Sequence, residues 1–342
     1  MSAPNIPGPP GPMLLGDHAE VARYGKTAPP GTQNIPFNNG RATDPPLVQV
    51  DAITRILVYP GSFNPPHRGH LHLLDHVFQN AGYKAEYHAA IILLMDDEHL
   101  TRKLESLPEN GLLVPLERRT ALWQQAVSHN DKYWVWDNGA MDNFTAFIDA
   151  LQLRLATHTT IELVGLLGPD SFSLTEPVPS PTTWYCRHLV TSNGWRGAAF
   201  AGDVMQRLPG CSTWRHTHTD RGEIGAEISR TMQGRDPEYI HREVERVVWN
   251  SQKSVWCLME EEIPGTILLY NAYDQVQGQE NMSSTDIRRA MAPLMERPGT
   301  VLQMANTLHA AGALSPNTLA ECIRDGVIRE IASTVEPASS SA

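Results

Sequence analysis

The sequence lacks long apolar runs and blocks of basic residues. None of its apolar stretches approaches the roughly 18 residues that a membrane-spanning helix needs, so neither a membrane span nor a membrane partner is predicted. The chain carries 27 lysines and arginines against 38 acidic residues, a formal net charge of -11. This balance argues against nucleic acid as a main partner. Any recognition of phosphate must therefore be local.

Cysteine is scarce and scattered. Cys186, Cys211, Cys257 and Cys322 form no C-x-x-C pair, so their spacing predicts neither a zinc knuckle nor a disulfide framework. The N-terminus also lacks the apolar stretch of a secretory signal. We therefore expect reduced thiols and a cytoplasmic or nuclear location, or both.

Proline, by contrast, is concentrated at one end. The first fifty residues hold ten of the 26 prolines, so residues 1–50 are predicted to be an extended or disordered arm. The folded domain is expected over residues 51–332, with an insertion at 193–262, C-terminal helices at 283–332 and a flexible tail at 333–342. With 342 residues and 41% hydrophobic content, the chain suffices for one sizeable core.

Apolar runs alternate with helical periodicities along this domain. Strands are expected at residues 56–59, 87–95, 161–167 and 266–270, with 185–191 as a further candidate, and helices from about 67–70 to Gly82, at 116–127, 145–156 and near 237–250. Repeated strand–helix units predict an α/β fold, a doubly wound parallel sheet. Residues 300–331 are expected to form a helical cap whose last helix begins at Ser315-Pro316.

The most informative segment is residues 59–71, Y-P-G-S-F-N-P-P-H-R-G-H-L. A buried strand ends at a glycine turn and a helix follows, which presents backbone N–H groups and a positive dipole end to phosphate. His67 and His70 lie on the same side of the first helical turn, and Gly69 leaves room for a ligand. A surface or metal-binding pair is the usual alternative for H-x-x-H. The glycine turn and the Asn-Pro pair favour phosphate here.

A second segment, residues 281–291, reads N-M-S-S-T-D-I-R-R-A-M. Ser283 and Asp286 approximate a capping box, so a helix is predicted to begin at Ser283 or Ser284. The free N–H groups there form another anion site, and Arg288 lies one turn inside, where its fork reaches toward a polyphosphate. Taken alone, this segment is better explained by an ordinary capped helix, because the S/T-x-x-D pattern is common.

Together the two segments resemble the signatures of a known superfamily. G-S-F-N-P-P-H-R-G-H-L is similar to the H-x-G-H signature of the nucleotidylyltransferases, in the version found in nicotinamide mononucleotide adenylyltransferases, and S-S-T-D-I-R is similar to their second signature, I-S-S-T-x-I-R. The resemblance covers roughly residues 53–292. It implies a Rossmann-like nucleotidylyltransferase fold with a C-terminal helical cap. It also implies adenylyl transfer from ATP to nicotinamide mononucleotide or nicotinic acid mononucleotide, giving pyrophosphate and, with the former, NAD.

The resemblance also implies roles for individual residues. Catalytic roles fall to His67, His70 and Arg288. Contacts with ATP fall to Gly61, Ser62, Phe63, Gly69, Gly168, Asp170, Ser283, Ser284 and Thr285. Contacts with the acceptor fall to Lys103, Trp134 and Trp136. Mg²⁺ is the expected cofactor, and phosphates and water supply most of its ligands, so no metal-binding residue is named.

Several alternatives stay open at this stage. Asp170 is also explained as a turn residue after Gly-Pro, and Lys103 as a solvated lysine on a charged loop. Arg118 and Arg119 suit either the family's next basic position or an exposed helix face. The H-T-H segment at residues 216–218 is expected to be a surface loop rather than a zinc site.

The function and the assembly also leave alternatives. The glutamate that the family places near the acceptor ring is not evident. A second hypothesis for the function is therefore transfer to another phosphorylated acceptor, or a cytidylyl transfer. A third hypothesis is that the protein binds nucleotide without catalysis. The sequence leaves a homo-oligomer open.

Overall fold

The computed structural model describes residues 13–24, 35–38, 44–81, 86–107, 111–137, 141–192, 205–217, 219–259, 266–271 and 282–334. Over these residues the main sheet has eight strands in the order β4-β2-β1-β5-β6-β9-β8-β7. The parallel strands are β1 (Ile53–Gly61), β2 (Ala89–Leu94), β4 (Tyr133–Trp136), β5 (Thr160–Leu166), β6 (His188–Ser192) and β9 (Ile267–Asn271). After β1 the chain adds β2 and β4 on one side of that strand and then β5, β6 and β9 on the other. The predicted doubly wound fold is therefore confirmed.

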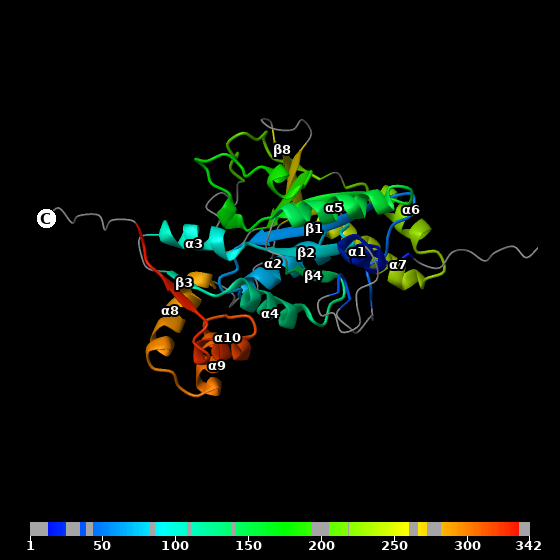
Figure 1. The fold of residues 1–342 in the computed structure, drawn as a ribbon. Helices are drawn as coiled ribbons and strands as arrows, with labels where there is room; N and C mark the ends of the chain where they lie inside the picture. The colour runs from blue at the N-terminus through cyan, green and yellow to red at the C-terminus, as the bar shows by residue number, and fades with distance from the viewer. Residues whose placement is uncertain are drawn as a thin grey trace, which may run out of the picture.

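Alternate side chains of the central strands enter two separate cores. Ile56 and Val58 pack with α5 (Met141–Leu155) on one face of the sheet. Leu57 and Tyr59 pack with α2 (Arg68–Gln79) and α4 (Leu116–Val127) on the other. Figure 1 shows these helices on either side of β1 and β2. Because helices cover both faces, β1 is apolar on both, which is why it reads as a continuous apolar run.

Most predicted elements form where the periodicity placed them. The helix predicted over 116–127 is α4, that over 145–156 is α5, and that near 237–250 is α7 (Pro237–Gln252); the strands predicted at 56–59, 87–95, 161–167, 185–191 and 266–270 are β1, β2, β5, β6 and β9. The last helix, α10 (Pro316–Arg324), begins after Ser315 as predicted. Helix α2 ends at Gln79, and Gly82, its expected end, lies outside the described residues.

Two segments differ from the prediction. The segment around Lys103, expected to be a charged loop, forms helix α3 (Asp97–Glu105), and the Asp96 carboxylate caps its start by accepting the His99 backbone N–H. The C-terminal cap is helical in α8 (Ser284–Glu296), α9 (Val301–Ala310) and α10, but it ends in a strand. This strand, β10 (Arg329–Ile331), pairs antiparallel with β3 (Gly111–Leu113), a partner more than 200 residues away in the sequence.

Part of the proline-rich N-terminal segment is folded, although the whole segment was expected to be extended or disordered. Helix α1 (Leu15–Tyr24) packs on α5, and Leu15 and Ala19 are fully buried. Phe37 and Val48 enter the same core. The proline content misleads because α1 itself contains no proline and carries apolar side chains at helical spacing.

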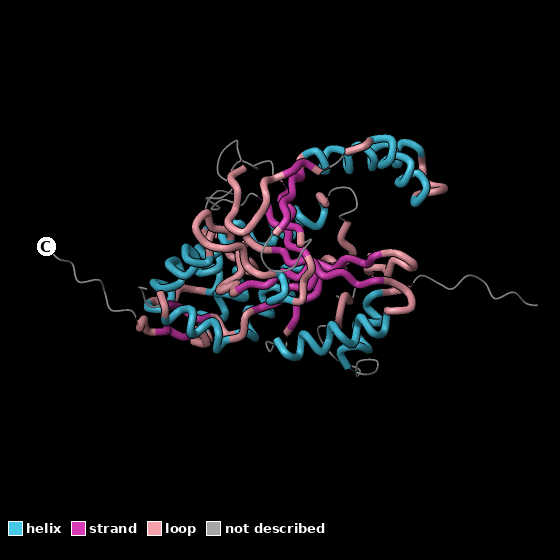
Figure 2. Tube along the Cα trace, turned by 90° about the horizontal axis from the view of Figure 1, so that it is seen from above, coloured by secondary structure: helices cyan, strands magenta, loops and turns pink. Residues whose placement is uncertain are grey.

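Within residues 193–262, predicted to be an insertion, two described strands extend the sheet at one edge. There β8 (Ser254–Leu258) pairs antiparallel with β9, and the short β7 (Arg215–His216) pairs with β8. Helices α6 (Arg221–Thr231) and α7 form a hairpin around a small core of their own. Figure 2 shows this hairpin standing out from the rest of the chain. No helix in the described ranges has the length and apolarity to cross a membrane.

The packing of α1 yields a stability prediction. Leu15→Ala should lower the free energy of unfolding by about 2–4 kcal/mol, the usual cost of such a cavity, as measured by urea denaturation. Leu153→Ala is the matched control, because Leu153 on α5 is 81% exposed and should change stability by less than about 0.5 kcal/mol. If Leu15→Ala lowered the free energy of unfolding no more than Leu153→Ala does, α1 would not contribute to the core.

Candidate active site

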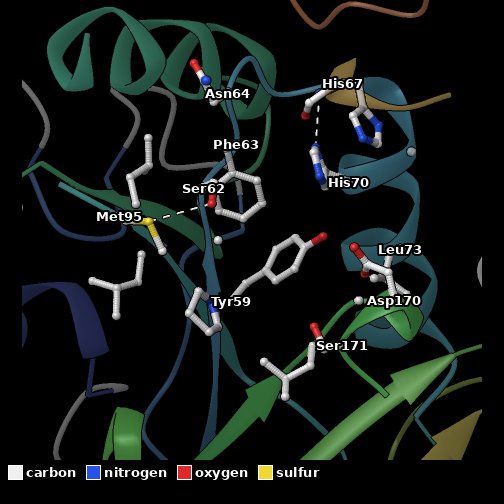
Figure 3. A pocket seen from close by; sticks show the side chains of 18 of the residues that line it. Tyr59, Ser62, Phe63, Asn64, His67, His70, Leu73, Met95, Asp170 and Ser171 are labelled. Atoms are coloured by element: carbon white, nitrogen blue, oxygen red, sulfur yellow. Dashed lines mark hydrogen bonds between the residues drawn. The ribbon is translucent and has the colours of Figure 1, made fainter. Parts of the chain in front are cut away.

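A cavity of about 890 Å³ lies at the carboxyl ends of the central strands. Its walls are the turn after β1, the first turns of α2, helix α3, the loop after β5 and the start of α8. Figure 3 shows one part of it. In doubly wound sheets the connections on either side of the first strand leave in opposite directions, and the gap between them is the usual binding crevice.

The turn after β1 is shaped by Asn64 and Gly61. The Asn64 side chain is buried, donates through Nδ2 to the Leu112 carbonyl and accepts the Val114 N–H at Oδ1, both at 2.8 Å. A Cβ at Gly61 would lie 2.6 Å from the Phe63 ring, so only glycine fits there. The turn is therefore held in place by contacts within the protein itself.

His67 and His70 lie together at the start of α2. Their rings stack with centroids 3.5 Å apart, and His70 Nδ1 accepts the His67 backbone N–H at 3.1 Å (Figure 3). The neutral His70 ring therefore carries its hydrogen on Nε2 and can donate it to a ligand. Burial, with a smaller contribution from His67, holds the pKa of His70 well below its usual value. His70 is thus a neutral donor at pH 7.

The second signature meets the first in space. Ser283 caps α8 by accepting the Asp286 N–H at 3.1 Å, which confirms the predicted helix start. The Ser284 hydroxyl donates to the Pro65 carbonyl at 2.8 Å, and Arg288 Nη1 donates to the Asn64 carbonyl at 2.6 Å. The N-termini of α2 and α8 therefore open on one cavity, and the capped-helix interpretation does not describe the whole role of this segment.

Lys103 and Asp170 lie on the two remaining walls. Lys103 is exposed on α3, and its Nζ donates to the Ser62 hydroxyl at 3.1 Å. Asp170 is exposed in the turn η1 (Pro169–Ser171) after β5 and lines the cavity, where Figure 3 labels it. A carboxylate at the end of a parallel strand is well placed to accept ribose hydroxyls.

Most residues proposed from the sequence line this cavity. They are Gly61, Ser62, Phe63, His67, Gly69, His70, Lys103, Gly168, Asp170, Ser283, Ser284, Thr285 and Arg288. They come from segments up to 227 residues apart (Gly61 to Arg288), so their convergence is a property of the fold rather than of one motif.

Trp134 and Trp136 do not line the cavity, and their prediction as acceptor-binding residues is wrong. Both lie in β4, only 1% and 2% exposed, and their rings pack edge to face against each other. Phe147 contacts both rings, and the Arg23 guanidinium of α1 lies over them. Indoles buried in this way cannot stack on a ligand without unpacking the core.

Other residues of the site were not found from the sequence. Trp184, at the end of the turn η2 (Pro181–Trp184), lines the cavity with Thr183 and Met141. No periodicity marks Trp184, because it lies in a proline-rich turn between two strands. The exposed-face interpretation of Arg119 is also wrong, because Arg119 is fully buried. No three His, Cys, Asp or Glu side chains are placed to hold a metal ion within the part of the chain that is described.

Comparisons with known proteins gave a family match and structural matches of low TM-score. A family model described as cytidylyltransferase-like matches residues 58–290, which include all of the segment at residues 59–71 and all but the last residue of the segment at residues 281–291. Among solved structures, two of Plasmodium falciparum nicotinic acid mononucleotide adenylyltransferase match, one complexed with NaAD and one with APC. They have TM-scores of 0.39 and 0.38, are each 10% identical, and cover 80% of this chain and 97% and 96% of their own. No curated protein matches the sequence.

The lowered pKa of His70 gives a prediction about titration. Ring proton resonances in NMR should show His70 neutral until well below pH 6.5 or so, identified by their loss in His70→Gln. ATP should move this titration to higher pH, because nearby phosphate charge favours the imidazolium. Without ligand the unfolded chain binds the proton more readily, so His70 destabilises the fold as the pH falls through the unfolded value toward the lowered one.

The control for this titration is His241, exposed on α7 and away from the cavity. Its resonances should not respond to ATP. A His70 titration that ATP leaves unchanged would contradict the placement of the polyphosphate beside the histidine pair.

Proposed function

The chain belongs to the cytidylyltransferase-like family, and from this we propose that it transfers the adenylyl group of ATP to nicotinamide mononucleotide, giving NAD and pyrophosphate, with nicotinic acid mononucleotide as a related acceptor. The observation that carries the proposal is the convergence of two helix N-termini on one cavity, with His67, His70 and Arg288 at the point where they meet. The choice of ATP rather than CTP as the donor rests on the first signature, which resembles that of the nicotinamide mononucleotide adenylyltransferases.

The triphosphate of ATP would lie between α2 and α8. Both helix N-termini present a positive dipole end to the cavity. His70 would donate from Nε2 to an oxygen around the α-phosphorus, with His67 beside it. Arg288 would hold the β,γ end, beside Ser283 and Ser284 at the start of α8. Asp170 would accept hydroxyls of a ribose.

The reaction would be a direct displacement. An oxygen of the acceptor phosphate attacks the α-phosphorus in line, the new P–O bond forms, and the bond to the α,β-bridging oxygen breaks with its electrons leaving on pyrophosphate. No covalent intermediate and no nucleophilic side chain are needed. The protein contributes alignment and hydrogen bonds that strengthen as charge develops on the leaving group.

Mg²⁺ fits such a site as an ion held by phosphate oxygens and water, and it would neutralise charge on the pyrophosphate. On the acceptor side, Lys103 beside Ser62 would hold the phosphate of the mononucleotide. Trp184 and Met141 lie along the cavity, and an aromatic face suits a flat cationic pyridinium. This arrangement replaces the role first given to Trp134 and Trp136.

The test is pyrophosphate release from ATP with nicotinamide mononucleotide, with nicotinic acid mononucleotide and with no acceptor. Release should depend on one of the two mononucleotides. His70→Ala should lower turnover by about 10² or more, the typical contribution of one transition-state donor, whereas His241→Ala should not. Faster release from CTP, or with a different phosphorylated acceptor, would overturn the assignment, and so would ATP binding without release on any acceptor.

Arg288 supplies a prediction specific to the donor. Arg288→Lys keeps the charge but loses the fork, so the KM for ATP should rise by about tenfold, the size of one charge-assisted hydrogen bond, while the acceptor KM changes less. Arg289→Lys is the matched control, because Arg289 is 68% exposed on the outer side of the same turn. If initial-rate kinetics show no change in ATP use, Arg288 does not bind the triphosphate.

A further inference from the structure

A second arginine, Arg119, lies behind the wall of the cavity. It is fully buried on α4, and its guanidinium donates to the carbonyl oxygens of Ser62, Met95 and Val114 and to the Asp97 carboxylate, each at 2.8 Å. A buried charge is costly and is kept where its hydrogen bonds are satisfied. Arg119 does not line the cavity, so it has no direct access to a substrate.

Two of these carbonyls belong to different walls of the cavity. Ser62 follows β1 and lies in the turn that faces the donor. Met95 follows β2 and leads into α3, on the acceptor side. The Met95 N–H donates to the Gly61 carbonyl at 3.0 Å, so the backbone already joins these walls at one point. Because a guanidinium is planar and its donors are fixed relative to one another, the Nη1 group that reaches both the Ser62 and the Met95 oxygens adds a second connection between the two walls.

Asp97 extends the connection to the start of α3. One oxygen of its carboxylate accepts from Arg119 and from the Leu116 N–H, and the other accepts from Arg329 of β10 at 3.2 Å. Asp97 is the first residue of α3, and Lys103 lies six residues further along the same helix, about 9 Å along its axis. The Lys103 ammonium then returns to the Ser62 hydroxyl at 3.1 Å.

The contacts therefore close a ring: Ser62 carbonyl, Arg119, Asp97, helix α3, Lys103 and Ser62 hydroxyl. We propose that Arg119 is a positioning residue that sets the place of Lys103 relative to the turn at Ser62, and through it the alignment of the acceptor phosphate with the α-phosphorus. This inference rests on the proposed function. In-line displacement is sensitive to misplacement of about 1 Å, which can cost about 10²-fold in rate.

A purely structural role for Arg119 makes a different prediction. In that case its substitution would lower stability and weaken the use of both substrates alike, and its effect would add to that of a change at Lys103. A positioning role acts through Lys103, so the two effects would not add.

The experiment compares Arg119→Lys, Lys103→Met and the double variant by initial-rate kinetics. Lysine keeps the charge but cannot reach the four acceptors at once. Arg119→Lys should raise the acceptor KM by about tenfold or more and the ATP KM by less than about threefold. The double variant should show the acceptor KM of Lys103→Met alone. Additive effects, or equal rises in both KM values, would overturn the proposal.

Arg118→Lys is the matched control. Arg118 is the preceding residue of α4, does not line the cavity and makes no side-chain hydrogen bond or ion pair with a described residue, so both KM values should stay unchanged. If Arg119→Lys does not fold, Asp97→Asn replaces it, because asparagine keeps the shape of the side chain and one acceptor oxygen. Asp97→Asn should raise the acceptor KM more than the ATP KM, by a smaller factor than Arg119→Lys.

Hydrogen exchange tests the coupling without any activity. Arg119→Lys should speed amide exchange in residues 61–64 and 97–105 together and leave β5 protected. If the wild-type protein transfers no nucleotidyl group, the proposed function fails while this measurement still decides whether Arg119 joins the two walls. Unchanged exchange in either segment would refute the coupling.

Discussion

The site depends on how one buried turn satisfies its backbone carbonyls. Residues 62–66 form this turn, and a buried carbonyl without a hydrogen-bond donor is costly. Two of the five residues are prolines, which have no N–H and so cannot donate to any carbonyl. Each donor comes from a distant segment: Arg119 for Ser62, Arg288 for Asn64, Ser284 for Pro65 and the Leu314 N–H for Pro66. The turn that faces the ligand is thus held by α4, α8 and the turn before α10.

The C-terminal helices are therefore part of the site. The Arg68 N–H, at the start of α2, donates to the Gly312 carbonyl at 2.9 Å, and residue 312 has a φ of +89° that favours glycine. A Cβ there would also lie 2.7 Å from the sulfur of Met282, which precedes the Ser283 cap. A change at this turn would reach both helix N-termini, although it lies outside both signatures.

Local signals could be predicted from the sequence, and long-range pairings could not. The strand and turn before His67 and the cap at Ser283 are encoded by neighbouring residues, so β1, α2 and α8 were found. The burial of Trp134 and Trp136 depends on α5 and α1 covering them, which no short window of sequence reveals. Arg119 looked like an exposed helix residue because three of its four acceptors, Ser62, Met95 and Asp97, lie 22 or more residues away. Similarly, β10 needed β3 as a partner.

The charge balance explains why the site uses neutral donors. At physiological salt the acidic surface is screened beyond about 8 Å, so the net charge of -11 does not decide binding in the cavity. Helix N-termini and a neutral His70 attract phosphate without placing an extra buried charge in the cavity, which would be costly to desolvate. Arg288 keeps its charge because the Asn64 carbonyl and the Thr285 hydroxyl accept from it. Protonation of His70 then becomes favourable only beside a polyphosphate, because the negative charge of the ligand stabilises the imidazolium.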